Sequence, residues 1–121
     1  MKRKHIYSKQ VEKIRKEDFL SLYLSCEPGK WFSNKELQVF PFPGRAQSLA
    51  GRYLIKKAIS DFLEEKEHMH EIEIFNDDLG KPEVILGEHI NQALKRRGIK
   101  KVECSLSHSQ NYIAGITLFC F

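Results

Sequence analysis

The sequence lacks a long apolar run and has few cysteines. No stretch approaches the roughly 20 apolar residues of a membrane span, and Met1–Lys4 precede no apolar segment of the kind found in signal peptides. The three cysteines, Cys26, Cys104 and Cys120, are an odd number without the spacing of a metal site. These absences favour a cytoplasmic protein with reduced thiols and argue against a disulfide-rich secreted domain.

The composition is that of an ordinary globular domain. The 121 residues are 41% hydrophobic and 30% charged, which is enough apolar material for one core. Since internal repeats, low-complexity tracts and linkers are absent, we expect a single domain over residues 1–121. The formal charge of +4 and the pI near 9.0 suit an acidic partner without identifying one.

The hydrophobic periodicity changes along the chain and predicts a mixture of helices and antiparallel strands. A short first strand is expected through His5–Tyr7, followed by a helix over Lys9–Leu24. Ser33 and Glu36 form a capping-box pattern that predicts a short helix ending at Val39. Further elements are a long helix over 45–63, a hairpin over 71–75 and 82–86, a helix over 87–97, and strands near 102–106 and 112–121.

The long helix is apolar around most of its circumference, which is typical of a helix buried in the middle of a domain. One polar stripe of Ser48, Arg52, Lys56 and Ser60 runs along it at steps of four, with Arg45 just before the stripe. Two interpretations remain open at this point. The cations pair with acids elsewhere or extend to water, or they hold a polyanion such as a set of phosphate groups.

A polar turn between the last two expected strands contains His108, flanked by Ser107 and Ser109. A histidine in a turn is most often solvated, but its imidazole and the neighbouring amides also suit a phosphate. The turn therefore adds a second candidate contact for a phosphorylated ligand.

Four separated segments together resemble one family. They are Trp31–Leu37, Arg45–Ala58, Gly80–Pro82, and Ser105–Ser109 followed by Tyr112. The small holo-acyl-carrier-protein synthase group of 4′-phosphopantetheinyl transferases has the similar patterns F-T-x-x-E-L, R-x-x-x-L-A-G-R-F-A-A-K-E-A, G-K-P and S-I-S-H-T-x-x-Y-A. Order and spacing agree over residues 31–118. The combination of Leu-Ala-Gly-Arg with the Ser-His-Ser turn carries the resemblance.

The resemblance implies an α+β domain of the 4′-phosphopantetheinyl transferase fold, with antiparallel strands packed on a long buried helix. It also implies a trimer that holds coenzyme A between subunits. The implied reaction moves the 4′-phosphopantetheine arm of coenzyme A to a serine of an acyl carrier protein and releases adenosine 3′,5′-bisphosphate.

The same resemblance assigns roles to individual positions. Lys56 is the implied catalytic residue, because it would stabilise phosphoryl charge. The first expected helix would dock the acidic carrier protein through Lys13 and Arg15. The implied coenzyme A contacts are Arg45, Arg52, Lys56, His108 and Ser109.

Two departures from the family pattern concern magnesium. No Gly-x-Asp occurs near residues 5–12, and Lys57 stands where the family has the metal-binding Glu. A lysine repels a divalent ion, so the metal position is unknown, with Asp61 as a weak candidate. Either the Lys57 ammonium replaces part of the metal's charge, or the Asp61 carboxylate supports the site, or the chemistry is lost.

These departures leave alternatives to a catalytic transferase. One is a relative that binds coenzyme A or a carrier protein without transfer. A remote third is a small nucleic-acid-binding protein, which the basic pI alone suggests and which lacks a recognisable binding motif.

Overall fold

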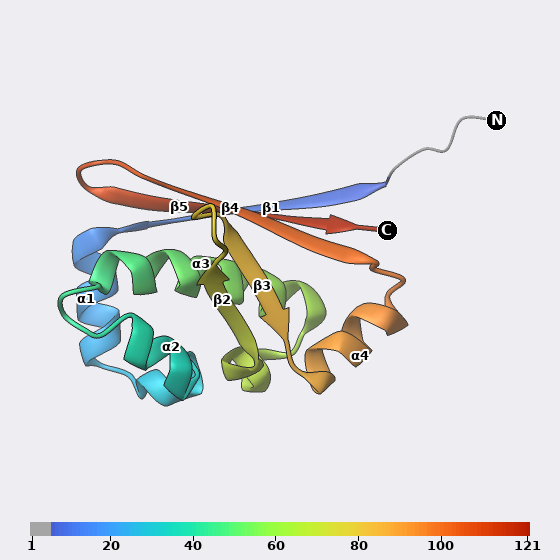
Figure 1. The fold of residues 1–121 in the computed structure, drawn as a ribbon, viewed down its shortest axis with the longest axis horizontal. Helices are drawn as coiled ribbons and strands as arrows, with labels where there is room; N and C mark the ends of the chain where they lie inside the picture. The colour runs from blue at the N-terminus through green and yellow to red at the C-terminus, as the bar shows by residue number, and fades with distance from the viewer. Residues whose placement is uncertain (1–5) are drawn as a thin grey trace.

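The computed structural model describes residues 6–121, which form an α+β fold in layers (Figure 1). The elements in chain order are β1 (Tyr7–Arg15), α1 (Lys16–Leu24), η1 (Pro28–Lys30), α2 (Asn34–Val39), α3 (Ala46–Leu63), η2 (Lys66–Glu71), β2 (Ile72–Asn76), β3 (Pro82–Leu86), α4 (Glu88–Arg96), β4 (Lys101–His108) and β5 (Tyr112–Cys120). An antiparallel sheet of order β1-β5-β4 forms one layer, and β2 pairs with β3 in a separate antiparallel hairpin.

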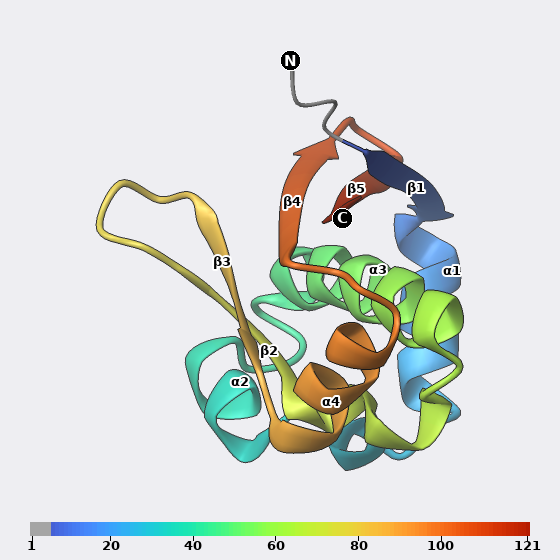
Figure 2. The ribbon, with the colours of Figure 1, turned by 90° about the vertical axis from the view of Figure 1, so that its right-hand side faces the viewer.

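Helix α3 lies between the three-stranded sheet and the remaining helices (Figures 1 and 2). Its apolar side chains contribute to both core clusters. One cluster joins α3 to the hairpin, α4 and the sheet through Ile55, Ile59, Ile72, Ile90 and Phe119. The other joins α3 to the N-terminal helices through Phe19, Phe32, Phe40, Leu49 and Ile113. The predicted buried central helix is therefore confirmed.

Two glycines allow α3 to approach the sheet closely. A Cβ atom added at Gly51 would lie 3.1 Å from Leu106 Cδ1, and one added at Gly115 would lie 2.9 Å from Ile55 Cδ1. The glycine of the Leu-Ala-Gly-Arg segment thus faces β4, where a larger side chain would push the helix away from the sheet.

Most elements after residue 30 agree with the sequence predictions. The capping box at α2 is present, because the Ser33 hydroxyl accepts from the Glu36 amide and the Glu36 carboxylate accepts from the Ser33 amide. The predicted hairpin, the helix over α4 and the two final strands are also confirmed.

The predicted helix over Lys9–Leu24 is wrong in its first half. Residues 7–15 form β1, which pairs with β5 along its whole length, and the helix begins at Lys16. Val11 and Ile14 are spaced three apart, which imitates a helix, although the alternating burial of β1 has a period of two. The part of the predicted first strand at His5 lies outside the described residues.

The sheet has two different faces. Residues 113, 115, 117 and 119 of β5 are buried beneath α3, whereas alternate residues of all three strands point away from it. The outer sheet face has an apolar group at its centre, with charged residues of β1 and β4 beside it: Val11, Ala114, Ile116 and Leu118, next to Lys9, Lys13 and Glu103. Among residues 6–121, no helix has both the length and the apolar character that crossing a membrane requires.

Candidate active site

A buried carboxylate, Glu36, connects α2 to α3 and β2. Its side chain is fully buried, and Oε1 lies 2.6 Å from Lys56 Nζ. The other oxygen, Oε2, accepts from the Ile74 amide at 3.1 Å. Sequence reasoning identified Glu36 through its capping box and did not predict this ion pair, because the partner lies in a different helix.

Lys56 is enclosed by protein. Its side chain has no exposed surface, and its ammonium donates to the carbonyl oxygens of Met69 and Ile72 as well as to Glu36. Burial lowers the pKa of Lys56, and the Glu36 carboxylate opposes that shift. The expected contact between Lys56 and a bound phosphoryl group does not agree with this placement, since all three donors of the ammonium are directed to protein oxygens.

Arg52 lies one turn earlier on α3 and is also largely buried. Its guanidinium donates to the carbonyls of Ile74 at 2.7 Å and Ser48 at 3.1 Å, and to Asn76 Oδ1 at 3.2 Å. The guanidinium stacks over the Phe40 ring at 3.7 Å from its centroid. Burial lowers the pKa of Arg52, although a guanidinium remains charged in proteins. Arg52 therefore ties α3 to β2.

Arg45 is the exposed residue that precedes the first turn of α3. It contacts the same Phe40 ring at 5.5 Å, and its Nη2 lies 3.4 Å from Ser48 Oγ. The helix macrodipole disfavours a cation at this end, and within the described residues α3 has no acidic side chain in its first turn. An anion bound here would therefore interact favourably with both the helix and Arg45.

The β4–β5 turn carries the other predicted ligand contacts. His108 is exposed at the end of β4, and the Ser109 hydroxyl accepts from the Tyr112 amide at 3.2 Å. His108 pairs in register with Ile113, whose side chain lines a small pocket together with Ala46 of α3. The turn thus lies near the N-terminal end of α3, which is the end that carries Arg45.

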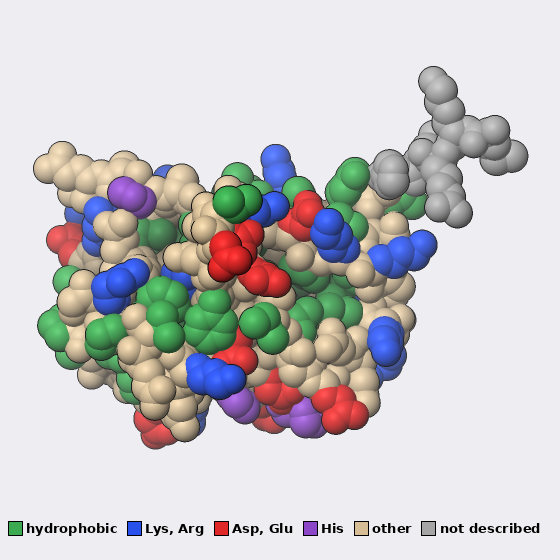
Figure 3. All heavy atoms as spheres, viewed as in Figure 1, with side chains coloured by type: hydrophobic (Ala, Val, Ile, Leu, Met, Phe, Trp, Pro, Cys, Tyr) green, Lys and Arg blue, Asp and Glu red, His purple; other side chains and the backbone are tan. Residues whose placement is uncertain are grey.

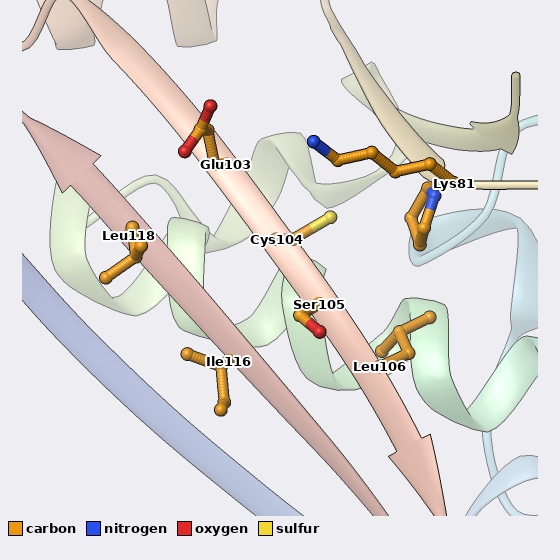
Figure 4. Close-up of a pocket in the computed structure, with 8 residues that line it drawn as sticks. Lys81, Glu103, Cys104, Ser105, Leu106, Ile116 and Leu118 are labelled. Carbon is orange, nitrogen blue, oxygen red and sulfur yellow. The ribbon is translucent and has the colours of Figure 1, made fainter.

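The Gly-Lys-Pro segment meets β4 across an open cleft (Figure 4). Lys81 and Pro82 line this cleft of about 300 Å³ together with Ser105 and Leu106. The Cys104 side chain points toward Lys81, and burial raises the pKa of its thiol to about 11. The thiol is therefore protonated at neutral pH and is not an activated nucleophile.

The structure thus joins the four separated sequence segments. Glu36 of the first pairs with Lys56 of the second, and Gly51 of the second packs on Leu106 of the fourth. Pro82 of the third meets Leu106 across the cleft.

Comparison with known proteins shows the family to which the chain belongs. No family model matches the chain, but individual relatives do. A holo-[acyl-carrier-protein] synthase of Fusobacterium nucleatum is 32% identical over 94 residues, which cover 74% of this chain and 77% of the relative. The synthase of Chlorobaculum parvum is 36% identical over 101 residues, covering 74% and 80%. The chain belongs to the holo-[acyl-carrier-protein] synthase family.

A solved structure supports the fold independently. The ACPS-CoA complex of Chronobacterium ammoniagenes superposes with a TM-score of 0.76 and 23% identity, covering 96% of this chain and 98% of that chain. The predicted α+β synthase fold is confirmed.

Lys57, the position at which the sequence resemblance places a metal-binding Glu, carries a cation in this synthase-family chain. The Lys57 ammonium lies 2.8 Å from Asp61 Oδ2 and 3.7 Å from Glu12 Oε1, so that carboxylates of α3 and β1 converge on it. The hydrogen bond that the Lys57 ammonium donates to the Asp61 carboxylate raises the pKa of Lys57, which keeps the ammonium charged. Magnesium does not fit at this position, because the ammonium already lies beside both carboxylates.

Lys13 and Arg15, the expected carrier-docking residues, lie on β1 rather than on a helix. Both are exposed. The Lys13 ammonium lies 5.0 Å from the centroid of the Tyr112 ring, and Arg15 pairs with Glu17 at 2.5 Å. Both cations are therefore exposed as expected, although the element that carries them is a strand and the prediction was a helix.

Proposed function

We propose that residues 1–121 act as a single transferase domain that moves the 4′-phosphopantetheine arm of coenzyme A to a serine of an acyl carrier protein. The serine hydroxyl oxygen forms a bond to the pyrophosphate phosphorus next to the arm and gives up its proton to solvent, and the bond from that phosphorus to the bridging oxygen breaks. Adenosine 3′,5′-bisphosphate leaves. The observation that carries the proposal is the convergence of the four family segments around α3 in a chain of this family.

The ligand-binding surface in this proposal is the end of the molecule where Arg45 and the β4–β5 turn meet. Arg45 supplies an exposed guanidinium at a helix N-terminus, His108 supplies its ring, and Ser109 supplies its hydroxyl, because the Ser109 amide already donates to the Tyr112 carbonyl. Arg52 contacts the same Phe40 ring as Arg45 and is fixed by its hydrogen bonds to β2. A phosphate would use the guanidinium N–H groups of Arg52 that do not donate to protein oxygens. Lys56 holds the scaffold rather than the ligand.

The Lys57 cluster has a separate role in the proposal. Phosphoryl transfer needs positive charge near the pyrophosphate. In this chain the Lys57 ammonium, positioned by Asp61 and Glu12, supplies part of that charge, although the two carboxylates offset it. Transfer should then proceed without a tightly bound divalent ion.

Mass spectrometry of an apo acyl carrier protein tests the function. After incubation with this protein and coenzyme A, the carrier should gain the mass of one phosphopantetheine arm, and a carrier with its acceptor serine replaced by alanine should gain none. If the wild-type carrier remains unmodified, transfer is excluded and the non-catalytic function described next remains.

The second candidate is a protein that binds coenzyme A or a carrier without transfer. Lys57 favours it, because a cation held by two carboxylates contributes less net positive charge than a metal ion would. This candidate predicts coenzyme A binding with no change in the carrier's mass.

Coenzyme A binding should depend on its phosphates. We expect Arg45→Ala to weaken binding roughly 10–100-fold, the equivalent of one lost hydrogen bond to a charged group. Added salt should weaken binding as well. Titration calorimetry measures both effects, and Lys95→Ala on α4 is the matched control because it removes an exposed cation elsewhere. Equal affinity for dephosphorylated pantetheine would contradict the phosphate contacts.

We also propose that the chain forms a homotrimer through the outer sheet face. Val11 and Ile116 are paired across β1 and β5 and remain 59% and 38% exposed, which is high for neighbouring apolar side chains in a sheet. Ile116 and Leu118 also line the cleft beside Lys81 (Figure 4). A second copy on this face would therefore complete the cleft.

Light scattering should give a mass about three times 14.2 kDa. Ile116→Glu should produce monomers, because it places a charge at the centre of the proposed contact. Leu24→Glu, at an exposed apolar position on α1, should leave the trimer intact. A monomeric wild-type chain at micromolar concentration would contradict the trimer.

The acidic carrier would dock at the end of β1 next to α1, where Lys13 and Arg15 lie beyond the proposed Val11–Ile116 contact between subunits. We also propose that this protein is cytoplasmic, because it would encounter both coenzyme A and the acyl carrier protein there.

A further inference from the structure

Two histidines and a glutamate converge on the side of the molecule away from the three-stranded sheet. His68 and Glu71 belong to η2, and His89 lies in the first turn of α4. One ligand atom from each lies within 4.8 Å of the other two. Figure 3 shows histidine and acidic side chains gathered along this edge, over η2 and the start of α4.

The geometry of the three side chains is convergent. Oε2 of Glu71 lies 2.9 Å from His68 Nδ1 and 2.7 Å from His89 Nδ1. The two imidazole rings stack with their centroids 4.2 Å apart and their planes 8° apart. Ligand atoms around a tetrahedral zinc ion are separated by roughly 3.3 Å, as zinc–nitrogen and zinc–oxygen bonds of about 2.0–2.1 Å require. A small outward movement of the rings would therefore admit an ion.

A carboxylate lies on the outer side of one of the two histidines. Oε2 of Glu65 lies 3.9 Å from His68 Nε2, the ring nitrogen that faces away from Glu71. Carboxylates that accept a hydrogen bond from the outer nitrogen of a ligating histidine fix its tautomer, and Glu65 lies just beyond hydrogen-bonding distance. Arg96 in turn lies 3.5 Å from the other oxygen of Glu65.

Glu71 is held in place by the start of α4. Its Oε1 accepts from the His89 amide at 3.3 Å, and its carbonyl accepts from the Gly87 amide at 2.8 Å. A Cβ atom at Gly87 would lie 2.5 Å from Oε1, so a glycine is needed for the carboxylate to take this position. The Glu71 side chain is only 18% exposed.

We propose that His68, Glu71 and His89 bind a divalent first-row transition metal, zinc in particular, with water as the fourth ligand. Two imidazoles and one carboxylate form a donor set that suits zinc and does not suit magnesium, which prefers oxygen ligands. The bound ion links η2, which follows α3, to the first turn of α4. It stabilises the fold at a position outside the cleft, whose lining contains none of the three residues.

The competing explanation is that Glu71 caps α4 and pairs with protonated histidines, with no ion involved. Zinc titration of chelator-treated protein distinguishes the two. Calorimetry should show one equivalent bound with a Kd of about micromolar or tighter, and cobalt(II) should give the visible absorption of a tetrahedral site. Zinc at a hundredfold excess over Kd should raise the thermal midpoint by on the order of 10 °C.

Variants locate the site. His68→Ala and His89→Ala should each weaken zinc binding at least 100-fold, because even loss of a residue that supports a ligand costs about 10–100-fold. His89 is exposed, so its alanine variant should fold as the wild type does. His70→Ala, on the same segment, should bind zinc normally. Absence of zinc binding by the wild type, or equal weakening by His70→Ala, would overturn the proposal.

Discussion

Replacing Glu36 with glutamine should lower the free energy of unfolding by about 3–5 kcal/mol. The glutamine keeps the size of the side chain and removes its charge, which leaves the Lys56 ammonium buried without a counterion. An unpaired charge in a water-free site is among the most destabilising single changes known in proteins. Urea denaturation followed by circular dichroism measures the loss.

The neighbouring lysine provides a matched control. Lys57 pairs with Asp61 at 2.8 Å, but its side chain is 39% exposed. Removing that exposed pair with Lys57→Met should cost no more than about 1 kcal/mol. A Glu36→Gln loss no larger than that of Lys57→Met would contradict the structural role assigned to Lys56.

The double variant adds a second check on the pair. Glu36→Gln combined with Lys56→Met leaves no buried charge, and such replacements are often close to neutral. The double variant should therefore be more stable than either single variant. Simple additivity of the two losses would mean that Glu36 and Lys56 do not interact.

Replacing Lys57 with glutamate should create a magnesium site that is much tighter than any in the wild type. The variant places three carboxylates, from Glu12, Asp61 and the new side chain, around the position of the ammonium. Replacing repulsion by attraction changes the binding energy of a divalent ion by a few kcal/mol in a partly exposed site. Magnesium affinity in the presence of coenzyme A should therefore rise on the order of 100-fold.

Two further variants separate charge from coordination. Lys57→Gln removes the repulsion without adding a ligand, so its magnesium affinity should lie between those of the wild type and Lys57→Glu. Asp61→Ala should leave the weak magnesium binding of the wild type unchanged. Tight wild-type binding that disappears in Asp61→Ala would show that the metal site has shifted and that Lys57 does not replace it.

Local sequence signals were sufficient for the elements that depend on nearby residues. The capping box of α2 is formed by Ser33 and Glu36, three positions apart, and the β2–β3 hairpin is marked by the turn residues between two alternating runs. The identity of β1 could not be found in this way. Its stability comes from pairing with β5, about a hundred residues later in the chain, and no local pattern records that partner.

The polar stripe of α3 shows the same limit at the candidate active site. The sequence indicated that Arg52 and Lys56 lie on a buried helix, and both interpretations of their charges were physically reasonable. Their partners are Glu36 of α2 and the backbone of η2 and β2, which only the tertiary arrangement brings near. Arg45, outside the buried part of the helix, retains an exposed charge.

The most direct test of the proposed function is the mass of an acyl carrier protein after incubation with this protein and coenzyme A, once with magnesium and once with a chelator. The account predicts a gain of one phosphopantetheine arm in both reactions, because Lys57 supplies charge that the protein carries itself. A gain with magnesium alone would contradict the role of Lys57 and leave the transferase assignment in place. No gain in either reaction would contradict the transferase function.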